Sequence, residues 1–232
     1  MAYKILKPEQ SRPVKGVLFD MDGLVLDTEV LYTRFWQEAV KQLGYPITWE
    51  QTLGMRSLTD ERAQQYLTSL FGPEIDCGEV RSIRIRLMDA WVSEHGVETK
   101  PGIWEFLDYL DEHQIPRAIT TSSPAERAQE YLTPLGLYER FDRICSVREV
   151  ACGKPEPDIY LYGAKCLGLE PGDCLALEDS PNGIMSAFQA GCMSVVIPDQ
   201  DEPSPETLRR SFARAQTLAD LPEMIRNMEK IK

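Results

Sequence analysis

The sequence contains very little histidine and no CxxC motif. Its two histidines, His95 and His113, are isolated, and none of its six cysteines is spaced as a metal-binding pair. Zinc sites are built from clustered histidine and cysteine side chains, so a zinc site is not expected. A chain of 232 residues is long enough to fold without disulfides. We therefore expect reduced thiols and a cytoplasmic protein.

Long apolar runs and excess positive charge are also missing. No stretch approaches the ~18 apolar residues of a membrane helix. The opening segment, MAYKILKPEQSRPVK, lacks the apolar core of a signal peptide. The chain carries 37 Asp and Glu against 25 Lys and Arg, which gives a net charge of −12. Such a surface repels nucleic-acid phosphates and anionic lipids, so neither nucleic acid nor membrane is expected as a partner.

Apolar runs that end in polar clusters recur along the chain. Three such runs are predicted to be strands: KGVLFD at 15–20, PRAITTSS at 116–123 and CLALEDS at 174–180. A further strand is predicted at MSVVIP, residues 193–198. Helical patterns lie between them, opened by Pro124 and Pro157 and closed by Gly168 and Gly191. This alternation predicts an α/β fold with a doubly wound, Rossmann-like parallel sheet.

The segment from residue 28 to residue 99 has a different pattern. Its periodic stretches all look helical, and no buried-strand run occurs among them. We therefore expect residues 1–27 and 100–232 to form the α/β core, with residues 28–99 as an inserted helical domain.

Several large side chains of this insertion have two readings. Tyr32, Phe35 and Trp36 fall at helical spacing, which favours the core of the helical domain over the lining of a cleft. Arg84 and Arg86 are most simply read as part of a solvated helix face.

Two carboxylates, Asp20 and Asp22, stand one residue apart at the end of the first strand. Glu178 and Asp179 end another strand, and in a parallel sheet both ends belong to one edge. A cluster of hard oxygen ligands suits Mg²⁺, which also relieves the repulsion between the acids. An EF-hand calcium loop is not expected, because LVLDTE continues apolar where that loop needs alternating oxygens.

A hydroxyl and a lysine are predicted at the same edge. Thr121 ends the second strand, and Lys154 lies in the proline-rich loop GKPEPD before a helix. A cation, a lysine and a hydroxyl that converge on one point describe a phosphoryl-transfer site. Considered alone, Lys154 is also consistent with a solvated surface lysine that has no role in a site. Considered alone, Thr121 is consistent with an ordinary hydroxyl residue at the end of a strand.

In this order the motifs resemble those of the haloacid dehalogenase-like hydrolase superfamily. FDMDGLVLDTE is similar to its first motif, ITTSS to its second, GKPEPD to its third and LEDSPNGIMSAFQAG to its fourth. The resemblance implies that Asp20 is the nucleophile and a metal ligand, and that Asp22 is the acid-base and a ligand through its carbonyl. It further implies a phosphoryl-binding group of Thr121, Ser122 and Lys154, a Mg²⁺ site completed by Asp179 and Glu178, and a helical cap at residues 28–99.

Within the superfamily the chain resembles the β-phosphoglucomutase-like branch, which contains mutases and phosphatases. The cap stretch LGMRS departs from the mutase pattern Lys-Gly-x-Ser-Arg at Leu53 and Ser57, and Tyr32 stands near the position of the mutase histidine. No lysine occurs between Lys41 and Lys100, as a Schiff-base phosphonoacetaldehyde hydrolase would need. The resemblance thus favours a phosphatase acting on a sugar phosphate or nucleotide. The resemblance makes Arg56 the candidate cap residue for contact with the substrate. Arg56 could equally be an ordinary surface arginine.

Two other functions stay open. A sugar-phosphate mutase would use Arg56 for a second phosphate and would yield an isomerised product. A binding or regulatory protein would keep the phosphate pocket without turnover, although such a protein usually lacks a catalytic carboxylate, and both are present here. We expect a monomer whose partner is a small phosphate ester.

Overall fold

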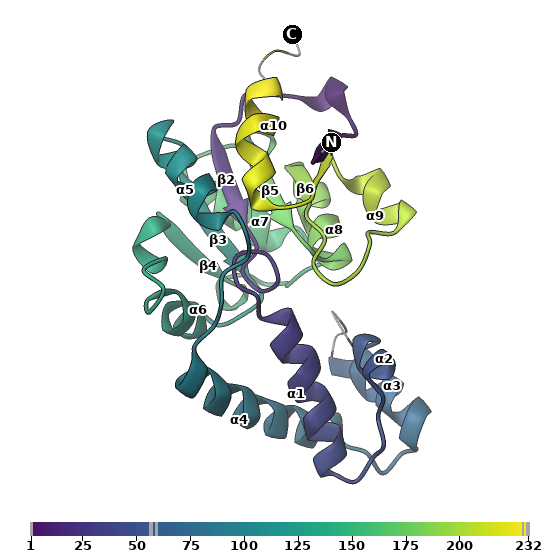
Figure 1. Ribbon diagram of the computed structural model, residues 1–232. Coiled ribbons are helices and arrows are strands. Elements are labelled where there is room, and N and C mark those ends of the chain that lie inside the picture. The colour runs from purple at the N-terminus through teal and green to yellow at the C-terminus, as the bar shows by residue number, and fades with distance from the viewer. Residues whose placement is uncertain (1, 56–57, 59, 229, 231–232) are drawn as a thin grey trace. The chain divides into compact units, whose positions relative to one another are not determined.

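The chain forms two compact units. The computed structural model describes residues 2–55, 58, 60–228 and 230. One unit comprises residues 1–27 and 98–232, and the other comprises residues 28–97 (Figure 1). The sequence placed the second boundary after residue 99. The difference has a local cause, because the N–H of Asp27 donates to the carbonyl of Glu98 at 2.8 Å and Leu26 pairs with Thr99.

The first unit is built on a seven-stranded sheet with the order β1-β7-β6-β5-β2-β3-β4. β1 runs antiparallel to β7, and the other neighbouring strands are parallel. This confirms the predicted α/β fold with a Rossmann-like sheet. The strands are β1 (Tyr3–Ile5), β2 (Gly16–Phe19), β3 (Arg117–Thr121), β4 (Arg143–Ser146), β5 (Cys174–Glu178), β6 (Met193–Val196) and β7 (Ala213–Ala215).

Helices cover both faces of this sheet, and the central strand β2 shows why. Its neighbouring residues Leu18 and Phe19 point to opposite faces and both are fully buried. The ring of Phe19 lies 5.6 Å from that of Phe106, while Leu18 packs with Ile159 and Tyr160. The helices of this unit are α5 (Ile103–Glu112), α6 (Ala125–Leu132), α7 (Asp158–Cys166), α8 (Pro181–Ala190), α9 (Pro205–Arg210) and α10 (Leu221–Met228). Single 3-10 turns occur at Pro8–Gln10, Tyr138–Arg140, Val147–Glu149, Pro171–Asp173 and Leu218–Asp220.

The second unit consists of helices, as its periodicity indicates: α1 (Glu29–Gln42), α2 (Trp49–Leu53), α3 (Asp60–Phe71) and α4 (Cys77–His95) (Figure 1). Phe35 of α1 is buried, and Trp36 packs against the apolar cluster of this unit. Across the part of the chain that the structure describes, no helix has the length and apolar character needed to cross a membrane.

Arg84 does not lie on a solvated face, so that prediction is wrong, although Arg86 is exposed as expected. The Arg84 residue is 8% exposed, and its guanidinium lies 4.9 Å from the ring centre of Tyr32 and 5.2 Å from that of Trp36. Arg84 belongs to the side of α4 that packs on α1. A guanidinium is weakly hydrated and stacks on aromatic faces, so it tolerates this position.

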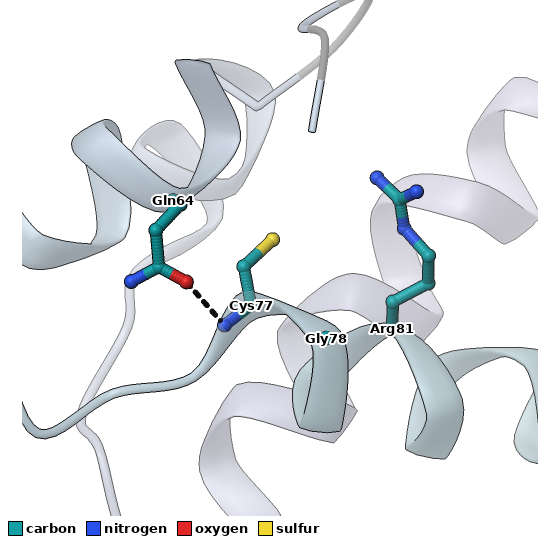
Figure 2. A pocket seen from close by; sticks show the side chains of 4 residues that line it. All are labelled: Gln64, Cys77, Gly78 and Arg81. Atoms are coloured by element: carbon teal, nitrogen blue, oxygen red, sulfur yellow. Dashed lines mark hydrogen bonds between the residues drawn. The ribbon is translucent and has the colours of Figure 1, made fainter. Parts of the chain in front are cut away.

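A small pocket of about 230 Å³ lies within the helical unit, lined by Gln64, Cys77, Gly78 and Arg81 (Figure 2). The side-chain oxygen of Gln64 accepts a hydrogen bond from the N–H of Cys77 at 2.8 Å. Its side-chain nitrogen donates to the carbonyl of Ile75, also at 2.8 Å. Gln64 thereby joins α3 to the first turn of α4, and the pocket marks this junction.

Candidate active site

The polar side chains singled out in the sequence lie at one edge of the sheet. Asp20 follows β2, Thr121 is the last residue of β3, and Glu178 is the last residue of β5. These three strands are adjacent and parallel, with β2 in the middle, so their carboxyl ends meet. An edge of this kind, beyond the carboxyl ends of the strands, is where open α/β sheets bind ligands.

The turn after β2 is held by backbone hydrogen bonds. The N–H of Asp20 donates to the carbonyl of Leu177 at 3.0 Å, and the carbonyl of Met21 accepts from both Val25 and Leu26 at 3.0 Å. Gly23 has a φ of +85°, a left-handed conformation that favours glycine. The chain can therefore reverse immediately after the two aspartates.

Lys154 links two carboxylates at this edge. Its ammonium group contacts Oδ1 of Asp20 and lies 2.6 Å from Oε1 of Glu178. The Lys154 side chain is only 7% exposed, and Glu178 is fully buried. Lys154 is therefore a buried counter-charge for two acids, which excludes its reading as a solvated surface lysine.

Side chains of α8 hold the loop that carries Lys154. Ser186 donates a hydrogen bond to the carbonyl of Glu156 at 2.5 Å, and Gln189 donates to the carbonyl of Pro155 at 2.7 Å. The peptide bond between Lys154 and Pro155 is cis. These side-chain to backbone hydrogen bonds therefore connect the loop of the third sequence motif to the helix of the fourth.

Glu178 is held by a side chain of α7 and by the N-cap side chain of α8. Its Oε1 accepts a hydrogen bond from the hydroxyl of Tyr160 at 2.6 Å, and its Oε2 accepts one from Ser180 Oγ at 3.1 Å. Ser180 is also the N-cap of α8, because its hydroxyl accepts from the N–H of Gly183 at 3.1 Å. A Cβ at Gly183 would lie 1.8 Å from the carboxyl carbon of Glu178, so only glycine fits there.

Burial sets the protonation behaviour of this group. Burial is the largest cause of the raised pKa of Asp20, which is about 8. The positive charge of Lys154 lowers this pKa, whereas the negative charges of Glu178 and Asp22 raise it further. Burial alone would lower the pKa of Lys154, but Asp20 and Glu178 more than offset this and raise it. Burial and the nearby charges also raise the pKa of Tyr160 well above its ordinary value, so its hydroxyl stays a donor.

A metal ion fits the same edge. Asp20, Glu178 and Asp179 each offer a carboxylate oxygen, and these oxygens lie within 4.8 Å of one another. A cation stabilises the charged form of crowded carboxylates, and an all-oxygen ligand set suits a hard divalent ion. The acidic cluster can therefore bind a metal ion.

The remaining predicted residues lie beside this cluster or outside the described chain. Thr121 is buried and its Oγ1 accepts a hydrogen bond from the N–H of Ser123 at 2.9 Å, while Ser122 is exposed. The side chain of Asp22 accepts from Ser123 Oγ at 2.9 Å. Arg56 lies outside the described residues.

Sequence reasoning missed Tyr160 and Ser123. Tyr160 was part of a helical pattern, which indicates burial but says nothing about where its hydroxyl points. Ser123 was the last member of a run of hydroxyl residues, TTSS, and its position two residues after Thr121 was the available signal.

Comparison with known proteins agrees with this geometry. The family model for haloacid dehalogenase-like hydrolases matches residues 17–197. Hexitol phosphatase A of Escherichia coli is 32% identical over 189 residues, which cover 79% of this chain and 82% of that protein. The structure of CbbY from Rhodobacter sphaeroides in complex with phosphate has a TM-score of 0.72 at 25% identity and covers 90% of this chain and 96% of that one.

The fold is also that of solved β-phosphoglucomutases. The enzyme from Clostridium difficile has a TM-score of 0.72 at 21% identity and covers 94% of this chain and 97% of that one. The match of the family model extends over most of the chain, from the start of β2 to the end of β6. The chain therefore belongs to the haloacid dehalogenase-like hydrolase family, and its fold is that of the β-phosphoglucomutase-like branch.

Proposed function

We propose that this chain is a Mg²⁺-dependent phosphatase that hydrolyses a small organic phosphate monoester, such as a sugar phosphate or a nucleotide. The observation that carries the proposal is the buried ammonium group of Lys154 between Asp20 and Glu178, beside a carboxylate cluster that suits a divalent cation. A phosphoryl group needs positive charge around its oxygens, and both the lysine and the cluster answer that need. The likeness to a hexitol phosphatase supports a sugar-type substrate.

Asp20 and Asp22 divide the chemistry between them. A carboxylate oxygen of Asp20 attacks phosphorus, the ester P–O bond breaks, and Asp22 gives its proton to the leaving oxygen. Asp22 then takes a proton from water, whose oxygen attacks phosphorus and displaces the Asp20 oxygen. Inorganic phosphate leaves, and both carboxylates return to their starting state.

The other predicted residues bind and orient the phosphoryl group. Thr121, Ser122 and Lys154 donate hydrogen bonds to its oxygens. The side chains of Asp20, Asp179 and Glu178 and the carbonyl of Asp22 would hold Mg²⁺, which would supply positive charge to neutralise the phosphoryl oxygens. The helical unit acts as a cap that selects the substrate, with Arg56 as its candidate contact.

The test is phosphate release from a panel of sugar phosphates, nucleotides and other monoesters, with Mg²⁺ and with chelator. We expect release from a narrow subset, loss of release with chelator, and loss of release in Asp20→Asn. Asp173→Asn is the matched control, because Asp173 pairs with Lys15 at the surface, at 2.8 Å. Isomerised sugar without net release of phosphate would replace the proposal with a mutase, and undiminished turnover in Asp20→Asn would overturn the mechanism.

A further inference from the structure

The carboxylate of Glu178 is unusually crowded with donors. A carboxylate offers two lone-pair sites on each oxygen. At Oε1 both sites are taken, one by the Tyr160 hydroxyl and one by Lys154 Nζ, each at 2.6 Å. At Oε2, Ser180 Oγ donates at 3.1 Å, while the backbone N–H of Ser180 is at a marginal 3.4 Å. The two oxygens of Glu178 are therefore not equivalent.

We propose that Tyr160 is a positioning residue for the metal site. The Tyr160 hydroxyl fills the second lone-pair site of Glu178 Oε1. Oε2 is then the Glu178 oxygen that keeps an open lone pair for a cation. This inference rests on the metal site of the proposed function and assigns a role to a residue outside the four sequence motifs.

The position of the Tyr160 hydroxyl is fixed by packing. The side chain is fully buried on α7, in the cluster that also contains Leu18 and Ile159. The Lys154 ammonium lies 5.3 Å from the centre of its ring, so the same tyrosine contacts both partners of the ion pair. A rigid aromatic side chain with two rotatable bonds can hold its hydroxyl in one place at a small entropic penalty.

Glu178 is also confined on its other side. The first turn of α8 approaches so closely that a Cβ at Gly183 would overlap the carboxylate, as described above. Glu178 therefore cannot retreat toward α8 when a donor is lost. Without the Tyr160 hydroxyl, its carboxylate would turn toward Lys154 and draw the ammonium group away from Asp20, which disturbs two ligands of the cluster together.

The test is a calorimetric titration of the full-length, metal-free protein with Mn²⁺ and with Mg²⁺, which needs no turnover. In Tyr160→Phe we expect the dissociation constant for metal to rise about 10–100-fold, the range found for partners that orient metal ligands. Tyr162→Phe is the matched control, because Tyr162 lies on the same helix and its hydroxyl donates to Glu149 at 2.9 Å. Its metal affinity should stay within about twofold of the wild type.

A double mutant separates positioning through Glu178 from a general structural effect. In a Glu178→Gln background, Tyr160→Phe should change metal affinity less than about threefold, because the two substitutions act on one interaction. An effect as large as in the wild-type background would overturn the inference, and so would an unchanged affinity in Tyr160→Phe. A wild-type protein that binds neither metal would overturn the inference and the Mg²⁺-dependent function together.

Ser180→Gly tests the assignment of Oε2 independently, including the case in which Tyr160→Phe does not fold by circular dichroism. Glycine keeps most of the capping function at this position and removes only the hydroxyl. Because that change opens a further lone pair on Oε2, metal affinity should fall less than about threefold. A loss of tenfold or more would show that Oε2 is not the ligand oxygen.

Discussion

The hydroxyl of Ser123 donates a hydrogen bond to Oδ2 of Asp22 at 2.9 Å. This bond joins the turn after β2 to the residues that follow β3. Ser123 is itself held, because Ser146 at the end of β4 donates to its carbonyl at 2.9 Å. The aspartate proposed to move the proton is thus oriented by a chain of two serines from neighbouring strands.

Ser123→Ala should slow turnover in a way that depends on the leaving group. A hydrogen bond to a charged group contributes about 1.5–3 kcal/mol, so a loss of roughly 10-fold or more is expected with an alkyl phosphate. The loss should be much smaller with p-nitrophenyl phosphate, whose leaving group departs without a proton. Ser82→Ala is the control, since Ser82 is exposed on α4 and donates to its own helix. Equal losses with both esters would contradict the role of Ser123 in orienting Asp22.

Asp20→Asn should stabilise the metal-free protein at pH 8 while it abolishes turnover. Burial raises the pKa of Asp20 to about 8, so the folded chain holds this proton more tightly than the unfolded chain. Its contribution to folding is therefore full below the ordinary pKa of aspartate and is lost as the pH rises through about 8. We expect the melting temperature to rise by about 2–4 °C, the shift that roughly 1 kcal/mol gives in a chain of this size.

Calorimetric scans in chelator at pH 5 and pH 8 measure this effect. The difference between Asp20→Asn and the wild type should be larger at pH 8, and added Mg²⁺ should stabilise the wild type but not the variant to the same extent. A variant less stable than the wild type at pH 8 would show that burial does not strain Asp20.

The candidate site at the sheet edge was predictable because its side chains directly follow strongly apolar runs. Asp20, Thr121 and Glu178 each end or follow such a run, and parallel pairing then brings the strand ends together. The strands β1, β4 and β7 were not predicted. β1 and β7 are only three residues long, and β4 begins with the exposed Arg143, so they carry too few apolar residues for a periodic signal.

The side-chain partners could not be predicted from local sequence. Tyr160 meets Glu178 across 18 positions of chain, and only the packing of α7 against the sheet decides that their polar atoms touch. Arg84 likewise reads as a surface cation until α1 brings Tyr32 and Trp36 to its guanidinium. Both residues carry polar groups into buried positions, where the pairing depends on the tertiary structure.

Gly183→Ala should weaken metal binding although it is a favourable change for a helix. Alanine has the higher helix propensity, by about 1 kcal/mol, but its Cβ would overlap the Glu178 carboxylate. Glu178 would have to move, which changes a proposed metal ligand. Gly78→Ala is a suitable control, because Gly78 also lies in the first turn of a helix and its Cβ would meet only the Asp76 side chain, nearest at Oδ1, 3.1 Å away. Unchanged metal affinity in Gly183→Ala would show that the position of Glu178 is not critical.

Lys154→Met should destabilise the metal-free protein strongly. Removing one partner of a buried ion pair typically costs about 3–5 kcal/mol, because the remaining charge is left without compensation. Here the remaining charges are Asp20 and Glu178, which both contact Lys154 and repel each other. Lys165→Met is the control, since Lys165 is exposed on α7. Its stability should be close to that of the wild type.

The dependence of this loss on pH and metal identifies its cause. At pH 5 Asp20 can take up a proton, since burial already raises its pKa, so the loss in Lys154→Met should be smaller than at pH 8. Mg²⁺ should recover more stability in the variant than in the wild type, because a cation in the cluster replaces the missing positive charge. Turnover should stay lost even with metal bound, since Lys154 is also proposed to hold the phosphoryl group. A loss of stability that is independent of both pH and metal would point to lost packing of the lysine stem instead of lost charge.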